Sequence, residues 1–204
     1  MAVRAVSSRG GNMIGRFPSL KLERMVAFES LIEQDYLYVL DYERDVSYYE
    51  EQPLTIEYLW QGKTLRYTPD FHAVWAQHHK LVECKPRVRL DIEENQRKFA
   101  IAHQWCQENG WTFSVVTDDE LRHGPRLANI KLLTRYARLN VAPSMFNQVE
   151  RYLHISQTPQ TLLNVAHLLV PDAPAQGVAI LLHIAFHHRI DVPVTTDTIS
   201  ASTQ

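Results

Sequence analysis

A proline-aspartate pair and a glutamate-lysine pair constrain this chain more than any other feature of its sequence. The first closes the run Tyr-Thr-Pro-Asp at Asp70, and the second lies in Val-Glu-Cys-Lys-Pro around Cys84. If both segments are strands, side chains alternate between faces, so Glu83 and Lys85 point to one side while Cys84 points into the opposite layer. Asp70 on the neighbouring strand can then lie beside them. The pattern predicts a sheet that gathers two carboxylates and one ammonium group.

Such a set of charges suits a metal-dependent phosphodiesterase. Mg²⁺ prefers carboxylate oxygens, and a lysine beside it can orient a water that attacks phosphorus. The simpler alternatives are that Asp70 ends a strand at a common turn dipeptide, and that Glu83 and Lys85 face solvent. Because the two motifs occur together across an expected hairpin, nucleic-acid cleavage is the leading hypothesis.

A third acid, Glu33, is the candidate to complete the site. It shares a helical stripe with Tyr36 and Leu40, which places it at the border of a buried face. The spacing Ser30-x-x-Glu33 also predicts an N-terminal capping box, in which the carboxylate only accepts a backbone N–H. Glu29, one turn earlier, is the competing candidate.

The histidines offer weaker signals. His72 follows the Asp motif and could position a water, although a surface place is the simpler expectation. His78 and His79 fit a turn. His183 and His187 have i, i+4 ligand spacing but no acidic or cysteine ligand nearby, so we expect them on a helix face that meets a partner, without zinc.

Size and charge limit the function classes. With 204 residues, 45% apolar, the chain allows one core and a small appendage, and its two cysteines predict reduced thiols in a cytoplasmic protein with no membrane segment. The net charge of −2 is unusual for a protein that binds DNA unaided. Positive charge is concentrated in residues 1–28 and at Lys85, Arg87 and Arg89, which flank the expected site and could contact DNA phosphates.

The order of predicted elements indicates an α/β or α+β fold with a mixed sheet between helices. Helices are expected from residue 28 and at 91–109 and 125–139, and strands at 46–52, 54–60, 65–75, 81–85 and 111–117. Helices at about 144–155, 159–169 and 174–188, followed by an extended or hairpin segment at 190–199, fit a small winged-helix-like module. We therefore expect a basic arm at 1–27, a nuclease domain at 28–140 and a partner-binding domain at 141–204. The apolar helix at 175–188 is expected to serve a protein interface.

Several motifs in register resemble TnsA, the endonuclease subunit of heteromeric bacterial transposases. They are Ser30-Leu31-Ile32-Glu33, Leu40-Asp41-Tyr42 with Val46, Glu51-Gln52-Pro53, Thr68-Pro69-Asp70-Phe71, Val82-Glu83-Cys84-Lys85-Pro86, and Trp111-Thr112-Phe113 leading to Thr117-Asp118-Asp119-Glu120. The resemblance implies a restriction-endonuclease-like (PD…ExK) core with Glu33, Asp70, Glu83 and Lys85 as its active site. By the same analogy, the carboxylates and the Cys84 carbonyl hold Mg²⁺, for which Mn²⁺ can substitute.

The family also implies partners. Such a subunit cuts the 5′ ends of the transposon, on the non-transferred strand, while an integrase-like transposase (TnsB-type) cuts and joins the 3′ ends, under an AAA+ ATPase regulator (TnsC-type). Some relatives belong to CRISPR-associated elements. Two alternatives remain open: a stand-alone PD…ExK nuclease of repair, resolvase or restriction type, and an assembly factor without catalysis.

Overall fold

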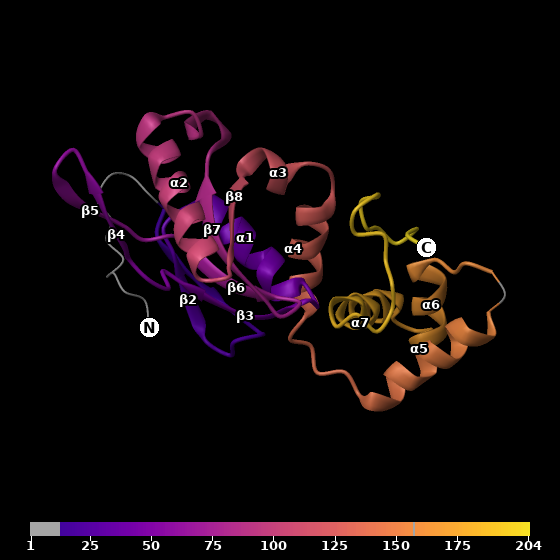
Figure 1. The fold of residues 1–204 in the computed structure, drawn as a ribbon. Helices are drawn as coiled ribbons and strands as arrows, with labels where there is room; N and C mark the ends of the chain where they lie inside the picture. The colour runs from indigo at the N-terminus through magenta and orange to yellow at the C-terminus, as the bar shows by residue number, and fades with distance from the viewer. Residues whose placement is uncertain (1–12, 157) are drawn as a thin grey trace. The chain divides into compact units, whose positions relative to one another are not determined.

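The computed structural model describes residues 13–156 and 158–204 of the chain (Figure 1). By its internal contacts the chain divides into two compact units, one reaching to Leu121 and the other starting at Arg122. The nuclease domain was expected to extend to residue 140, so the division falls earlier than the sequence indicated. Each unit is described by itself below.

The first unit is built on a four-stranded mixed sheet, as expected from the element order. Its strands are β3 (Val46–Glu51), β6 (Phe71–Trp75), β7 (His78–Lys85) and β8 (Thr112–Thr117), in the spatial order β3-β6-β7-β8. The pairs β3–β6 and β6–β7 are antiparallel, whereas β8 runs parallel to β7. The long connection that a parallel pair needs is supplied by the helix between β7 and β8.

Helices cover both faces of this sheet. Phe71 pairs with Val82 across β6 and β7, and the Tyr36 ring of α1 (Leu31–Tyr42) lies 5.9 Å from Phe71, so α1 covers the face of Val82. Leu81 points to the opposite face and packs in one cluster with Ala102 of α2 (Glu93–Glu108). The end of β7 is therefore buried on both sides, and any charged side chain there needs a partner.

Two hairpins are attached to the sheet. One joins β4 (Ile56–Trp60) to β5 (Lys63–Tyr67) and extends away from the four-stranded sheet (Figure 1). The sequence had predicted a single strand over 65–75. The structure breaks it at Pro69-Asp70, since proline has no N–H to donate to a ladder.

The other hairpin joins β1 (Gly15–Pro18) to β2 (Met25–Phe28), within the segment expected to be a basic arm. Phe17 and Val26 are buried, and the carboxylate of Asp41 accepts hydrogen bonds from the Ser19 hydroxyl at 2.6 Å and the Leu20 amide at 2.9 Å. This buried carboxylate fixes the loop, so residues 15–28 belong to the folded unit. The first twelve residues of the expected arm lie outside the described residues.

The described part of the second unit contains four helices, one of which is apolar and packs against two of the others. They are α4 (Arg126–Tyr136), α5 (Pro143–Ile155), α6 (Leu162–Leu169) and α7 (Pro174–Phe186), and α3 (Asp118–Arg122) lies at the division between units. Helix α7 packs against α4 and α6, which explains why α4 joins this unit. Gly177 approaches α6 so closely that a Cβ there would lie 2.5 Å from the Ala166 carbonyl oxygen.

Helix α7 was expected to serve a partner interface, and that interpretation is wrong. Its residues Leu181 to Phe186 are buried in the unit itself. The rings of His183 and His187 lie 3.0 Å from the carbonyl oxygens of Tyr136 and Ala137, at the C-terminal end of α4. The two histidines therefore hold the end of α4, and His183 is buried there.

The hairpin wing expected near residues 190–199 is not formed, because the described part of the second unit contains no strand. The segment is held instead by Asn129, whose amide nitrogen lies 2.7 Å from the Asp197 carbonyl oxygen and whose amide oxygen accepts the Ile199 N–H at 3.0 Å. Within the described ranges, no single helix has the length and apolarity to cross a membrane; α6 and α7 pass that test only together, bent by 114°.

Candidate active site

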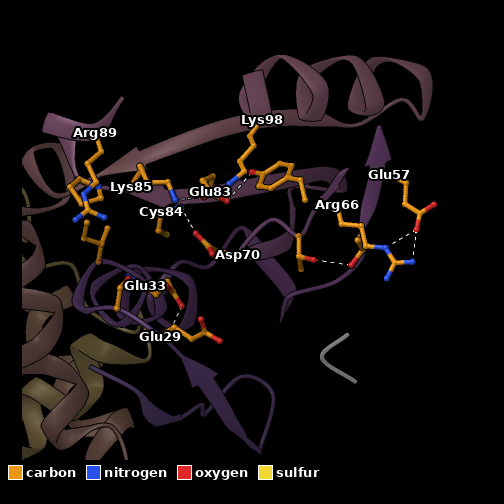
Figure 2. A pocket seen from close by; sticks show the side chains of 16 residues that line it. Glu29, Glu33, Glu57, Arg66, Asp70, Glu83, Cys84, Lys85, Arg89 and Lys98 are labelled. Atoms are coloured by element: carbon orange, nitrogen blue, oxygen red, sulfur yellow. Dashed lines mark hydrogen bonds and ion pairs between the residues drawn. The ribbon is translucent and has the colours of Figure 1, made fainter. Parts of the chain in front are cut away.

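A cavity of about 910 Å³ opens in the first unit where β7 ends (Figure 2). The start of α1, the β4–β5 hairpin, the segment before β6 and the end of β7 all contribute to its wall. The four residues predicted to be catalytic all line it: Glu33, Asp70, Glu83 and Lys85. Elements separated by fifty residues in the sequence thus bring together the predicted set.

Glu83 and Lys85 lie on one side of β7, as their spacing predicted. The Lys85 Nζ is 2.6 Å from Glu83 Oε1, and the Tyr67 hydroxyl donates to Glu83 Oε2 at 2.8 Å. Glu83 is only 4% exposed, so these two donors provide the compensation that a buried carboxylate requires. Sequence analysis had not selected Tyr67, although it lies three residues before Asp70 in the same motif.

Asp70 lies just before β6, beside the strand that carries the other two groups. Its Oδ2 accepts the Cys84 N–H at 2.7 Å, and its own carbonyl oxygen accepts the Gln52 N–H at 2.8 Å. Pro69 keeps the preceding chain extended, which directs Asp70 toward β7. Figure 2 shows Asp70 between the Glu83–Cys84–Lys85 segment and the helix that carries Glu33.

Glu33 occupies the third position of α1 and makes the capping box that the sequence predicted. Its Oε2 accepts the Glu29 N–H at 2.8 Å, and its own N–H donates to the Ser30 hydroxyl at 3.1 Å. The side chain also lines the cavity. In the structure, Glu33 therefore caps the start of α1, and its side chain also lies at the wall of the cavity, where it could reach a bound substrate or ion.

The charges of the cavity influence one another. Burial, and then the nearby Glu83 and Glu33 carboxylates, raise the pKa of Asp70 well above its ordinary value. Burial first, and also neighbouring carboxylates, raise the pKa of Glu33. For Lys85, burial alone would lower the pKa, but the adjacent Glu83 outweighs it and the pKa is raised. Lys85 is therefore an ammonium group at neutral pH, surrounded by acids that repel one another.

Comparison with known families gives one match. Residues 43–118 match the model of the TnsA-like endonuclease N-terminal domain. The chain carries a TnsA-like domain. No curated protein matches the chain. The match supports a TnsA-type protein and a DNA endonuclease of that type.

The matched segment of the TnsA-like domain includes Asp70, Glu83 and Lys85, but it begins after Glu33. The α1 acid is thus connected to the site by the geometry alone. The match ends at residue 118, before the second unit begins, so it says nothing about the helices of that unit.

Basic side chains surround the TnsA-like cavity. Arg89, predicted to contact DNA, lines it, together with Arg66 and Lys98, which sequence analysis missed. Arg66 lies in β5, and the alternation of side chains along a strand does not show whether a basic residue faces a cavity or solvent, so the sequence did not single it out. The third predicted DNA contact, Arg87, belongs to the short 3-10 helix η1 (Arg87–Arg89), and its N–H donates to Asp118 Oδ1 at 2.8 Å.

Oxygen donors of the kind that Mg²⁺ prefers are present, and each of the three carboxylates has at least one protein partner. Both oxygens of Glu83 and one each of Asp70 and Glu33 hold hydrogen bonds or ion pairs. In the described ranges, no group of three or more histidine, cysteine, aspartate or glutamate side chains is arranged to hold a metal ion. The donor types still suit a hard divalent cation, because three carboxylates and one ammonium line the same cavity, and burial and the neighbouring carboxylates raise the pKa of Asp70.

His72 is not part of this site. It is buried rather than on the surface, and its ring lies between Glu50, at 3.3 Å, and the His79 ring, at 2.9 Å. Trp111 stacks against both imidazoles, with centroids 4.4 Å from His72 and 4.9 Å from His79. His72 pairs with Leu81 across the sheet, so its side chain lies on the face that α2 covers. Its partner His79 lies near the start of β7, whereas Asp70 contacts the end of that strand.

Proposed function

We propose that this chain is the metal-dependent endonuclease subunit of a heteromeric transposase and cuts the non-transferred strand at the 5′ ends of a transposon. The observation that carries the proposal is the convergence of Asp70, Glu83 and Lys85 in one cavity of a TnsA-like domain. A nuclease requires such an arrangement of carboxylates and a cation at the point where negative charge develops on phosphorus.

In the proposed site, Asp70, Glu83 and the Cys84 carbonyl would hold one Mg²⁺, and Glu33 would hold a second ion or its water. Mn²⁺ is expected to substitute. When bound, the ion supplies Lewis-acid polarisation of the phosphoryl oxygen and a more acidic water. The Cys84 N–H keeps Asp70 oriented, and Tyr67 keeps Glu83 in a single rotamer. These donors preorganise the acids before substrate arrives.

Lys85 acts as a cation in this proposal. Its raised pKa makes a general-base role at neutral pH unfavourable, since the group stays protonated. Its ammonium, freed from Glu83 as the acids are neutralised, aligns the attacking water and stabilises charge on the phosphate. Hydrolysis by in-line attack then leaves a 5′-phosphate and a 3′-hydroxyl.

Low affinity for DNA is consistent with work in a complex. The net charge of −2 provides little non-specific attraction to phosphates. We propose that a TnsB-type transposase places the chain at transposon ends and that a TnsC-type ATPase regulates it. A nuclease recruited in this way is kept from nicking other DNA.

The decisive experiment is a cleavage assay on transposon-end DNA with Mg²⁺, with and without the sister transposase. The expected result is a nick at the 5′ end that needs the transposase and disappears in Asp70→Asn. Efficient cutting by the isolated chain would instead support a stand-alone nuclease. Cutting by Asp70→Asn at the wild-type rate would show that the site is assigned wrongly.

A further inference from the structure

The β4–β5 hairpin presents two chemically different faces. Ile56 and Tyr58 point toward α2 and belong to the apolar cluster of the first unit. The alternate residues point to the other side, which we call the outer face: Thr55, Glu57, Leu59, Thr64, Arg66 and Thr68. Four of these six line the catalytic cavity: Thr55, Glu57, Arg66 and Thr68. The outer face is thus a continuous extension of the cavity wall.

The outer face ends in an exposed apolar side chain. Leu59 is 74% exposed, beside the turn of the hairpin. Single exposed leucines are ordinary on protein surfaces, so exposure alone does not indicate a binding site. Leu59 matters because it lies on the same face as the cavity residues, about 13 Å along the strand from Thr55 by the rise per residue.

The side chains between the cavity and Leu59 are of the kinds that bind a sugar-phosphate backbone, a guanidinium and two hydroxyls. Arg66 and Glu57 form an ion pair at 2.8 Å with both side chains largely exposed, at 75% and 55%. Exposed pairs of this kind contribute about 0–1 kcal/mol, so a phosphate can compete for the guanidinium. The hydroxyls of Thr55 and Thr68 lie 2.8 Å apart beside it and offer further donors.

The hairpin is anchored at both ends, which fixes the outer face relative to the carboxylates. At its base, Tyr67 donates to Glu83. At its tip, the Arg97 guanidinium of α2 lies 4.5 Å from the centroid of the Trp60 ring, on the side opposite Leu59. A surface held in this way can position a substrate, because it does not have to be ordered on binding.

We propose that the outer face of the β4–β5 hairpin binds the DNA duplex next to the cut, with Arg66 on a backbone phosphate and Leu59 against the sugar edge of a groove. The inference rests on the proposed nuclease function and adds the surface that sets the register of the cut. From the cavity to Leu59 the face covers about four base pairs at the rise of duplex DNA. Protein–DNA recognition uses both elements, phosphate contacts for register and apolar contacts within a groove.

Binding of the full chain to a labelled transposon-end duplex tests this, measured by fluorescence anisotropy at low salt with EDTA to prevent cleavage. Leu59→Glu is expected to weaken binding about tenfold, the loss of one buried leucine contact. Arg66→Ala is expected to reduce the slope of log K against log salt by about one, the signature of one lost phosphate contact. The matched control is Ile155→Glu, which adds a charge at a 70% exposed apolar residue in the second unit and should bind like wild type.

A shortened duplex gives a second readout. If DNA beyond the cut ends before about four base pairs, wild type and Leu59→Glu should bind equally, because the contact partner is gone. Circular dichroism of each variant checks that the fold is retained. Should a variant fail to fold, the shortened duplex with wild-type protein carries the test alone, and equal affinity for short and long duplexes then overturns the proposal.

The outcomes separate this inference from the proposed function. If wild type cuts DNA and Asp70→Asn does not, while Leu59→Glu and Arg66→Ala bind and cut like wild type, the hairpin proposal is wrong and the nuclease assignment stands. Normal DNA binding by both variants with loss of transposase binding would assign the outer face to a protein and also overturn the proposal. If wild type neither binds the duplex at low salt nor cuts it in the presence of the sister transposase, both proposals fail.

Discussion

The Nζ of Lys85 lies 2.6 Å from Oε1 of Glu83, two residues earlier on the same strand. This contact makes the lysine a charge-balancing group and explains why its pKa is raised despite burial. The same ion pair satisfies one oxygen of a carboxylate that is only 4% exposed, and the Tyr67 hydroxyl satisfies the other.

Replacing Lys85 with methionine should abolish cleavage while the fold remains. Methionine keeps much of the side-chain volume but removes the charge that aligns water and stabilises the phosphate, so we expect a loss of about 100-fold or more in rate. Glu83 also loses its cation, so the Tm should fall. Single-turnover cleavage and thermal unfolding measure the two effects. A Lys85→Arg variant that retains more activity than Lys85→Met would support a role for charge.

Asp70→Asn should stabilise the metal-free protein at neutral pH. The folded pKa of Asp70 lies above the unfolded value, so the folded state binds more protons and stability is lost as pH rises from about 4 through the folded pKa. Asparagine removes this cost and still accepts the Cys84 N–H. We expect a Tm higher by a few degrees at neutral pH and little difference in acid.

Mg²⁺ should raise the Tm of wild type more than that of Asp70→Asn. The ion neutralises the crowded acids, and the variant has lost one ligand. Differential scanning calorimetry with increasing Mg²⁺ measures this without any cleavage. An equal shift in both proteins would remove Asp70 from the proposed ligand set.

Tyr67→Phe tests the donor that sequence analysis missed. Phenylalanine preserves the packing of the ring but leaves Glu83 Oε2 without its hydroxyl partner, which should cost about 1–2 kcal/mol of unfolding free energy. Urea denaturation measures the loss. The cost of Tyr67→Phe should be smaller when Glu83 is already glutamine, since the change then leaves a neutral amide oxygen unpaired instead of a buried carboxylate oxygen.

Acidification should destabilise the protein through His72. Burial is the main cause that lowers the pKa of His72 in the folded state, so below pH 6.5 the unfolded chain binds more protons and stability is lost as pH falls toward the folded value. A His72→Gln variant should show a flatter dependence of Tm on pH in that window. If His72→Gln left the slope of Tm against pH unchanged, His72 would not be the group that causes the loss of stability in acid.

Asp41→Ala should destabilise the first unit without touching the catalytic acids. Its buried carboxylate accepts from Ser19, from two amides of the β1–β2 loop and from the Tyr49 hydroxyl. Leaving these donors unpaired should cost about 3 kcal/mol. Asp45→Ala, at an exposed turn position, is the matched control and should change stability by less than about 0.5 kcal/mol.

Local patterns predicted the parts of the fold that local physics decides. The Ser30–Glu33 spacing predicted the cap of α1, although the helix was expected from residue 28 and begins at Leu31. Alternation along β7 placed Glu83 and Lys85 on one side, as the structure shows. The β1–β2 hairpin escaped prediction because its strands are short and its loop is fixed by Asp41, some twenty residues later. No pattern within residues 13–27 carries that information.

The second unit shows the limit most clearly. A helix that is apolar on several sides, such as α7, can belong either to an interface or to a buried core, and its sequence does not distinguish the two. The structure shows that α7 packs against α4 and α6 and is buried from Leu181 to Phe186. Likewise, Asn129 holds a segment seventy residues away, which prevents the expected wing. Such long-range contacts also moved the division between units ahead of α4.

Cys84 donates its peptide N–H to Asp70, and its thiol is buried in the wall of the catalytic cavity. A backbone donor is independent of the side chain that accompanies it. A protein engineer could therefore exchange this thiol for alanine, which removes its sulfur atom from the cavity wall and keeps the donor that orients Asp70.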